Sequence, residues 1–327
     1  MGKLITTIVS TLLVWSAAVS AVEKNIAPLD LSGYADKQGS ISIQYQGNTV
    51  DPYFVLQALL LAKENGLDIS SYAMTWANWL VTRQKPDGTF DRFCMNGPVW
   101  VPCKTADADD ALMAIWLKYL GTMPVELKSN PIWIKSFHQS SANLQHLLQP
   151  SRGIYMVSPV YLHGLFMDNL EVLSYLQDGD NPEQVRAANQ LAKGIQSTFW
   201  DVQNQRFLVS TQFEQKASAT SFYPDQVAQI FPLLFDFKLQ HADRKTYYQQ
   251  WMKKYRAIWL AQSRNDFAWG LIAVISYQQG DRISAGCWLR ESSSAQRTSH
   301  WIVTDEVAKQ ILVQHGIQAA AKSVDCQ

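Results

Sequence analysis

The chain has 327 residues, of which 47% are apolar and 17% are charged, a composition typical of a folded globular protein. Lysine and arginine together number 28, as do aspartate and glutamate, so the formal net charge is zero. A balanced charge lacks the basic surface that nucleic acid binding requires, and it equally disfavours a strongly cationic groove for an acidic polymer. We therefore expect no nucleic acid partner.

Residues 1–21 have the pattern of a secretory signal peptide. Lys3 provides the positive charge, residues 4–18 are apolar, and residues 19–21 fit a cleavage site of small residues. The apolar stretch is short for a membrane span, and no later stretch is long and apolar enough to cross a bilayer. We expect a monomer, periplasmic or secreted. Its mature part, residues 22–327, is predicted to form one domain because no linker or shift in composition divides it.

Four cysteines in an exported chain predict disulfide bonds. Cys94 and Cys103 flank a loop that contains proline and glycine, and we expect them to close it. Cys287 and Cys326 would then tie the C-terminal tail to the last hairpin. The alternative, a zinc site, lacks the C-x-x-C spacing and nearby paired histidines. The sequence therefore predicts no metal ion and no cofactor.

In chain order, an irregular segment (22–50) with a short strand at 41–46 precedes a series of helices. Pro52 suits the first position of the first helix. A loop at 89–105 and a partly extended connection at 207–222 interrupt the series. The helices are predicted at about 51–65, 70–84, 104–121, 131–148 and 182–200, and from near 165, 224, 243, 265, 281 and 304.

Six of these helices are apolar nearly all round and begin near an aspartate, whereas those between them have one polar face. The starts are marked by Asp51, the 107–110 cluster, Asp168, Asp225, Asp266 and Asp305. The alternation predicts an inner ring of parallel helices backed by an outer ring, an all-α (α/α)6 toroid. The inner helices would all begin on the same rim. Only five outer helices are clear, so the sixth position is irregular, missing or formed by the tail.

Several phrases resemble the bacterial six-hairpin glycosidase-like toroids. They are DNLEVLSYL at Asp168, IQSTFWDVQNQRFLVS at Ile195, FYPDQVAQIFPLLF at Phe222 and NDFAWGLIAVISYQQGD at Asn265. The resemblance covers most of the mature chain and implies the toroid fold and a saccharide substrate. The Glu-led motif that carries the acid in family 8 endoglucanases has no match here, so that assignment does not carry over.

A second resemblance is to class II terpene cyclases, which also use α-toroids. Residues 107–110, DADD, are similar to their D-x-D-D acid motif, and QKPDGTF at 84–90 is similar to their Q-x-x-D-G-x-F/W repeat. The repeat occurs once here, the chain is short for that family, and export does not suit isoprenoid substrates. We therefore favour the glycosidase-like reading.

Glycoside cleavage needs two carboxyl groups about the scissile bond, one protonated and one that attacks or activates water. A separation of roughly 5–5.5 Å implies retention of configuration, and roughly 6.5–9.5 Å implies inversion. The carboxyl candidates on the shared rim are Asp107, Asp109, Asp110, Asp168, Glu171 and Asp225. Crowding raises the pKa of such groups, which suits a general acid. We expect Asp110 or Asp107 as the acid and Asp168 or Asp225 as the base.

The alternative reading of these aspartates is structural, because aspartate is a preferred N-cap residue. Asp51, Asp266 and Asp305 fit that role better than catalysis. Glu171, three residues after Asp168, is equally well explained as the partner in a capping box. Three acids at 107–110 exceed what one cap requires, which keeps chemistry open for that cluster.

Aromatic side chains provide flat surfaces on which sugar rings stack. Most of the tryptophans belong to the core, including Trp76, Trp79, Trp116 and Trp251 within helices. The candidates for substrate binding lie in loops or at helix starts: Trp100, Tyr161, Tyr223 and Trp269, with Arg92 and His163 as polar companions.

Together these features predict an exported glycoside hydrolase that acts on a polysaccharide or oligosaccharide by carboxylate acid/base chemistry. One alternative is a non-catalytic saccharide-binding or assembly factor in exopolysaccharide production. The other is a polysaccharide lyase or epimerase acting on uronic acids, for which Tyr161, His163 and Arg92 would supply the required groups.

Overall fold

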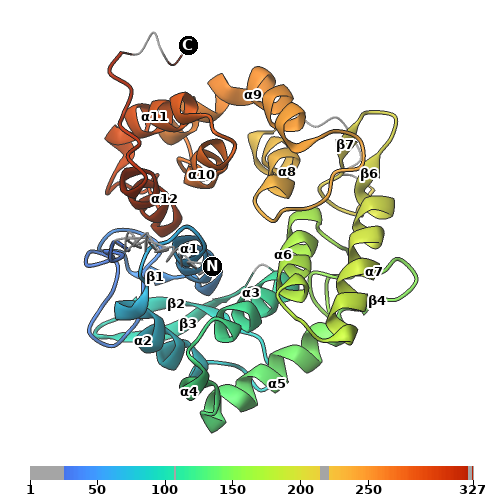
Figure 1. The fold of residues 1–327 in the computed structure, drawn as a ribbon. Helices are drawn as coiled ribbons and strands as arrows, with labels where there is room; N and C mark the ends of the chain where they lie inside the picture. The colour runs from blue at the N-terminus through green and yellow to red at the C-terminus, as the bar shows by residue number, and fades with distance from the viewer. Residues whose placement is uncertain (1–25, 107, 214–220, 323–325, 327) are drawn as a thin grey trace, which may run out of the picture.

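A computed structural model describes residues 26–106, 108–213, 221–322 and 326, so the expected signal peptide lies outside the described residues. The helices form two concentric rings (Figure 1). The inner ring consists of α1 (Pro52–Glu64), α3 (Asp109–Gly121), α6 (Phe166–Gln177), α8 (Val227–Ile230), α10 (Gly270–Gln278) and α12 (Val303–Gln314). The outer ring consists of α2 (Ser70–Val81), α5 (Pro131–His146), α7 (Pro182–Phe199), α9 (Arg244–Ala261) and α11 (Arg282–Glu291), and the short α4 (Val125–Lys128) precedes α5.

The two rings follow from the two classes of helix. The inner helix α10 buries every residue from Gly270 to Ser276, as a helix that is apolar all round must. The outer helix α7 buries one stripe of its surface, made by Ala188, Leu191, Ile195 and Phe199, together with Gly194. The last inner helix, α12, packs against α1 and closes the ring (Figure 1). The predicted all-α toroid is confirmed.

The space between the rings is filled by large aromatic side chains. The tryptophans assigned to the core from the sequence are all buried: Trp76, Trp79, Trp116 and Trp251. Trp259, Trp288 and Trp301 are also fully buried. Within the described part of the chain, no helix combines the length and the apolar character needed to cross a membrane.

The fourth inner helix is shorter than the sequence suggested. It consists of a π-helical turn (Phe222–Gln226), α8, and a 3-10 turn (Phe231–Leu233). Pro232 lies in the last turn, and proline has no N–H to continue an α-helix. The helix predicted from near residue 224 is therefore present in this interrupted form, and the segment keeps its place in the ring.

The sixth outer position is held by the irregular N-terminal segment, one of the three possibilities left open. Its residue Leu31 is completely buried, and the backbone of Asp30 exchanges two hydrogen bonds with Gln310 of α12. The N–H of Val303 donates to the carbonyl of Ile43. The strand expected at 41–46 is reduced to single bridges, in which Ile41 pairs with Ala35 and Gln44 with Ile302.

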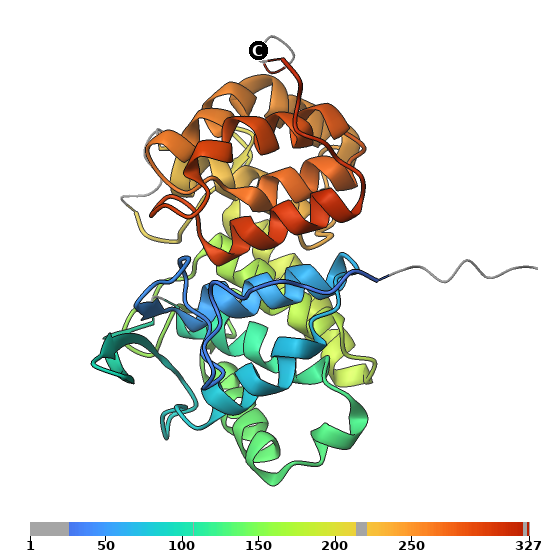
Figure 2. The same cartoon turned by 90° about the vertical axis from the view of Figure 1, so that its left-hand side faces the viewer.

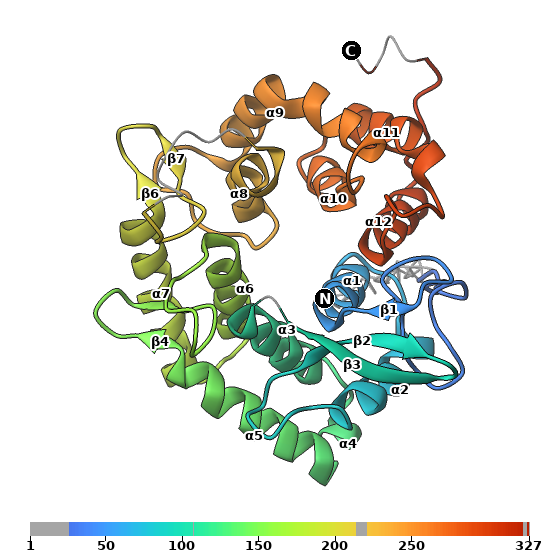
Figure 3. The ribbon, with the colours of Figure 1, turned by 180° about the vertical axis from the view of Figure 1, so that it is seen from behind.

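The expected loop at 89–105 is a β-hairpin. Strands β2 (Asp91–Asn96) and β3 (Val99–Thr105) pair with each other, and β1 (Thr49–Val50) pairs with β2. The hairpin extends beyond the helix ends on one face of the ring (Figure 2), where it lies over α1 and α3 (Figure 3). Two-residue strands form two further pairs: β4 (Leu148–Gln149) with β5 (Ile154–Tyr155), and β6 (Trp200–Asp201) with β7 (Arg206–Phe207).

The structure contains both disulfide bonds expected from the sequence. Cys94–Cys103 ties β2 to β3, and Cys287–Cys326 ties the C-terminal end of the chain to α11. The first bond therefore constrains the hairpin that covers one face of the ring.

A glycine in the middle of α7 allows a close approach. A Cβ atom at Gly194 would lie 2.7 Å from the carbonyl oxygen of Arg152, below any normal contact distance. Alanine usually stabilises a helix by about 1 kcal/mol relative to glycine. Here we expect Gly194→Ala to lower the free energy of unfolding by about 1–3 kcal/mol, because the backbone at Arg152 must move. Urea unfolding measures this change.

Gly121→Ala is the matched control for that substitution, because a Cβ atom at Gly121 meets no atom within 4 Å. We expect it to leave stability unchanged or to raise it by up to about 1 kcal/mol. Equal effects of the two substitutions would contradict the close approach of α7 to residues 152–153.

Candidate active site

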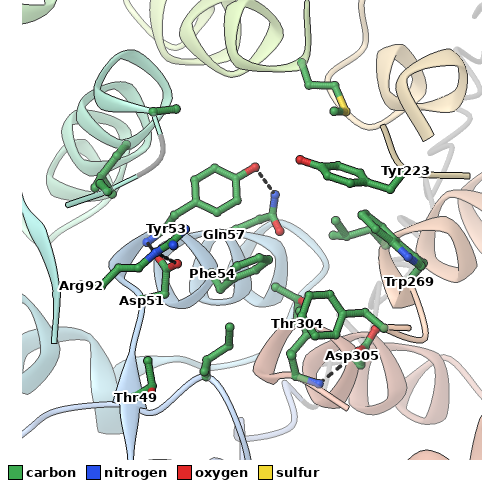
Figure 4. Close-up of a pocket in the computed structure, with 18 of the residues that line it drawn as sticks. Thr49, Asp51, Tyr53, Phe54, Gln57, Arg92, Tyr223, Trp269, Thr304 and Asp305 are labelled. Carbon is green, nitrogen blue, oxygen red and sulfur yellow. Dashed lines mark hydrogen bonds and ion pairs between the residues drawn. The ribbon is translucent and has the colours of Figure 1, made fainter. Parts of the chain in front are cut away.

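A cavity of about 530 Å³ opens at the face of the ring where the inner helices begin. Its walls come from the first turns of α1, α3, α6, α10 and α12, from the segment around α8, and from the β2–β3 hairpin (Figure 4). The shared rim expected from the sequence is thus also the site of this cavity. The polar and charged side chains that line it are Thr49, Asp51, Tyr53, Gln57, Arg92, Lys104, Asp168, Tyr223, Asp266, Thr304 and Asp305.

Three carboxyl groups gather where α3 and α6 pack together: Asp110, Asp168 and Glu171. Asp168 and Glu171 are three residues apart in α6, so they lie on the same side of that helix. Only Asp168, at 9% exposure, lines the cavity, while Asp110 and Glu171 are buried behind it.

The cluster retains protons more strongly than isolated carboxyl groups do. Burial raises the pKa of Asp110 well above its ordinary value, and the nearby charge of Asp168 raises it further. Burial, and then Asp168, likewise raise the pKa of Glu171. Neither Oδ2 of Asp110 nor Oε2 of Glu171 has a hydrogen-bond partner among the described residues. The site therefore holds carboxyl protons at a pH where exposed carboxyl groups are ionised.

Two residues of α1 complete this cluster, and the sequence analysis missed both. The hydroxyl of Tyr53 donates a 2.7 Å hydrogen bond to Oε1 of Glu171, and the amide of Gln57 donates to the same hydroxyl over 3.1 Å. Burial and the neighbouring Glu171 raise the pKa of Tyr53 well above 10, so the hydroxyl stays a donor. Their i, i+4 spacing, at the start of an inner helix, is the one sequence signal that could have identified them.

The capping alternative fails for the cluster. Helix α6 begins after Leu165 and α3 after Ala108, and neither helix has a side-chain cap. Asp168 and Glu171 lie inside α6, so Glu171 is not the partner of a capping box. Neither Asp110 nor Asp168 occupies an N-cap position, although Asp110 does serve the start of α3, because its Oδ1 accepts the N–H of Ala111.

Asp51 is a true N-cap and also anchors the hairpin. Its Oδ1 accepts the backbone N–H of Tyr53, and its Oδ2 forms a 2.6 Å ion pair with Nε of Arg92 on β2 (Figure 4). Arg92 lines the cavity, as expected for a binding residue, but it is engaged by this carboxylate.

Asp266 and Asp305 also line the cavity, and neither is a simple cap. Asp266 is exposed in the loop before α10, whose N-cap residue is Trp269, so the capping prediction for Asp266 is wrong. Asp305 accepts the backbone N–H of Ile302, near the start of α12, and also that of Gly270 in α10. Burial raises the pKa of Asp305 to about 7.

Aromatic rings form one side of the cavity. Tyr223 and Trp269 stack with their ring centroids 5.1 Å apart and their planes 27° from parallel (Figure 4). Phe54 and Phe267 meet edge to face nearby. Both Tyr223 and Trp269 were candidates for substrate binding, and the structure brings them together as a pair that faces Tyr53 across the cavity.

The other acidic candidates are not brought into the cavity. Asp109 is half-buried, burial raises its pKa, and its charged neighbours are Lys85, Asp87 and Asp91. Asp225 accepts hydrogen bonds from the N–H and the hydroxyl of Ser221 and does not line the cavity. Asp107 lies outside the described residues.

Three candidates for substrate binding also lie away from the cavity. Trp100 is buried in the outer part of the hairpin, where its indole N–H donates to Asp36. Tyr161 and His163 lie in the loop before α6, and their rings contact each other. The trio proposed for a lyase is therefore not assembled, since only Arg92 lines the cavity.

No group of three or more His, Cys, Asp or Glu side chains among residues 26–106, 108–213, 221–322 and 326 is arranged to hold a metal ion. The two cysteines in the cavity wall, Cys94 and Cys103, are joined as a disulfide.

No protein-family model and no curated protein matches the sequence. Solved structures do match the fold. An alpha-amylase from Clostridium perfringens superposes with a TM-score of 0.57 over 87% of this chain and 95% of its own length, at 9% identity. A GH63 mannosylglycerate hydrolase from Thermus thermophilus, in complex with glucose, gives 0.51 over 87% and 97%, at 11% identity. An uncharacterized conserved protein from the same organism gives 0.50 over 87% and 96%, at 11% identity.

These similarities extend over nearly the whole of each matched protein, and at such low identity they establish the architecture alone. The inner and outer rings of helices described above agree with that architecture. The chain has an (α/α)6 toroid fold.

Proposed function

We propose that this protein is an exported glycoside hydrolase that cleaves a polysaccharide or oligosaccharide. The observation that carries the proposal is the carboxyl cluster of Asp110, Asp168 and Glu171, which opens through Asp168 into a cavity with an aromatic wall. Cleavage of a glycosidic bond requires a protonated carboxyl group and a second carboxyl group, and an aromatic wall offers a surface on which a sugar ring can stack.

In this proposal, the three carboxyl groups share protons, and Asp168, when it holds one of them, is the acid that protonates the leaving glycosidic oxygen. From the sequence we favoured Asp110 or Asp107 as the acid and Asp168 or Asp225 as the base. Asp110 is completely buried and does not line the cavity, and Asp107 lies outside the described residues, so the proposal gives the role of the acid to Asp168. The role of Asp110, with Glu171, is to keep a proton on the cluster, because adjacent carboxyl groups cannot all ionise at low cost. Tyr53 fixes the position of Glu171 through its hydrogen bond.

The second carboxyl group is assigned to Asp266. The other acidic side chains in the wall already have structural partners: Asp51 is paired with Arg92, and Asp305 accepts two backbone N–H groups. Asp266 is exposed in the loop before α10 and lines the cavity, which supports a role in activating water or in attacking the sugar.

Two of the similar structures are named as an alpha-amylase and a mannosylglycerate hydrolase, which supports hydrolysis of a glycosidic bond. Two disulfide bonds support an oxidising compartment, the periplasm or the cell exterior, in agreement with the signal-peptide pattern of residues 1–21.

A product assay tests the proposal. The mature chain is incubated with maltotriose, cellotriose, chitotriose and trigalacturonate and with bacterial polysaccharides, and new reducing ends are identified by mass spectrometry. Release of saccharides with new reducing ends supports a hydrolase. Products that absorb in the near ultraviolet would instead mark a lyase, and glycan binding without any product would favour a non-catalytic binding or assembly factor.

A further inference from the structure

The backbone at Trp269 has an unusual conformation. Its φ of 55° and ψ of 51° lie in the left-handed region, which bulky residues seldom occupy. Such a conformation persists only where the surrounding structure holds it, and it is concentrated at functional sites. Trp269 is also the N-cap residue of α10 and half of the aromatic pair in the cavity.

Three hydrogen bonds, two of them buried, hold the peptide groups on either side of this residue. The indole N–H of Trp288 donates to the carbonyl of Ala268 over 2.6 Å, and that of Trp259 donates to the carbonyl of Trp269 over 3.3 Å. The N–H of Gly270 donates to Oδ1 of Asp305 over 2.7 Å.

Asp305 differs from the two indoles because it joins two inner helices. Its Oδ2 accepts the N–H of Ile302, so each of its oxygens receives one backbone donor. It is 1% exposed, and α10 and α12 approach closely here, since a Cβ atom at Gly270 would lie 2.6 Å from Cβ of Ala308. A carboxyl group is costly to bury in its ionised form, and a helix cap alone would be served as well by an exposed one.

We infer that Asp305 is a positioning residue, which fixes Trp269 so that the Trp269–Tyr223 pair forms a rigid stacking surface for a sugar ring of the substrate. This inference rests on the proposed saccharide function. A surface that is already ordered before the ligand arrives loses little conformational entropy on binding. We therefore expect the loss of Asp305 to weaken the affinity for the substrate and to leave the rate of the chemical step nearly unchanged.

Asparagine at position 305 is the most specific test. It keeps the shape of the side chain but has one acceptor oxygen and an NH₂ group, so it cannot accept from both Gly270 and Ile302. Asp281→Asn is the matched control. Asp281 is the N-cap of the outer helix α11, and its two oxygens also accept one hydrogen bond each, from Ser284 and Tyr248, away from the cavity wall. Trp288→Phe removes a second brace of the same segment and serves where Asp305→Asn does not fold.

The first measurement is amide hydrogen exchange of the peptide covering residues 266–271, without ligand. We expect exchange to be about tenfold faster in Asp305→Asn and in Trp288→Phe, because each substitution removes a hydrogen bond that holds this segment. Asp281→Asn should exchange like the wild type in this peptide. Unchanged exchange in Asp305→Asn, or in Trp288→Phe where Asp305→Asn does not fold, would overturn the bracing, whatever the protein's function.

The second measurement is steady-state kinetics on the trisaccharide that the wild type cleaves. In Asp305→Asn we expect KM to rise about tenfold while kcat changes by less than about threefold, and the control should match the wild type. Faster exchange with an unchanged KM, or with a loss in kcat alone, would overturn the stacking role. If the wild type cleaves only a polysaccharide, the same kinetics are measured on that polysaccharide. If it cleaves none of the trisaccharides and none of the polysaccharides, the hydrolase proposal fails. The affinities of the same sugars then decide, and equal binding by the wild type and Asp305→Asn, or no binding by either, would overturn this inference.

Discussion

Replacing Asp168 with asparagine is expected to lower kcat for saccharide hydrolysis by about 10²–10⁴-fold, the range lost when a general acid is removed. Asp168 is the member of the carboxyl cluster that lines the cavity, so it is the group that reaches a bound substrate. Asparagine has nearly the same shape but no transferable proton. Product release measured by mass spectrometry gives the change, and circular dichroism verifies the fold.

Asp225→Asn is the control for that experiment. Asp225 precedes a neighbouring inner helix but does not line the cavity, and its side chain accepts hydrogen bonds from Ser221. We expect its activity to stay within about threefold of the wild type, as for surface changes away from the chemistry. Full activity in Asp168→Asn would show that Asp168 is not the acid. A loss in Asp225→Asn as large as that in Asp168→Asn would show that the loss is not specific to Asp168.

The second large effect concerns stability and pH. Burial, and then Asp168, raise the pKa of Glu171 in the folded protein well above its value in the unfolded chain. Between these two pKa values, the folded state holds a proton that the unfolded state has lost. The free energy of unfolding therefore falls as pH rises, by up to about 1.4 kcal/mol per pH unit. Below the pKa of the unfolded chain, this loss is absent.

Glu171→Gln removes this titration but keeps the oxygen that accepts from Tyr53. As the pH rises from 5 to 8, we expect the free energy of unfolding of the variant to increase by about 1–3 kcal/mol relative to that of the wild type. Urea unfolding at both pH values measures the gain. Titrating groups that do not interact with Glu171 cancel in the comparison because both proteins carry them.

Asp243→Asn provides a control of the opposite kind. Asp243 caps α9 at the protein surface, and hydrogen bonds from Thr246 lower its pKa. It is ionised at both pH values, so the substitution should lower stability equally at pH 5 and pH 8. A pH-independent difference between Glu171→Gln and the wild type would show that Glu171 is ionised throughout and that the cluster does not hold a proton there.

These expectations place function and stability in opposition at one site. The carboxyl cluster to which we assign proton transfer also destabilises the folded state. Neutral replacement of Glu171 is expected to stabilise the protein, whereas neutral replacement of Asp168 is expected to remove the acid. Such a trade is common where an active site keeps buried charges close together.

The alternation of apolar and one-sided helices determined the architecture, because an apolar helix must be covered on every side and a one-sided helix can cover it. The sequence also predicted the approximate helix starts, the common face on which the inner helices begin and the two disulfide pairs. Each of these depends on residues close in the sequence or on the order of the elements. The short fourth inner helix could be anticipated only in part: Pro232 was visible, but its effect on the preceding turns was not.

The make-up of the site was decided by tertiary packing. The sequence named Asp110, Asp168 and Glu171, yet only the packing of α3 on α6 shows that Asp168 alone faces the cavity. Tyr53 and Asp305 act through partners 118 and 35 residues away, and no local pattern encodes such distances. The sequence alone does not distinguish an aspartate that caps a helix from one that holds a neighbouring helix in place or carries a proton. The burial and the hydrogen-bond partners that distinguish these roles arise only when the inner helices pack together in the folded ring.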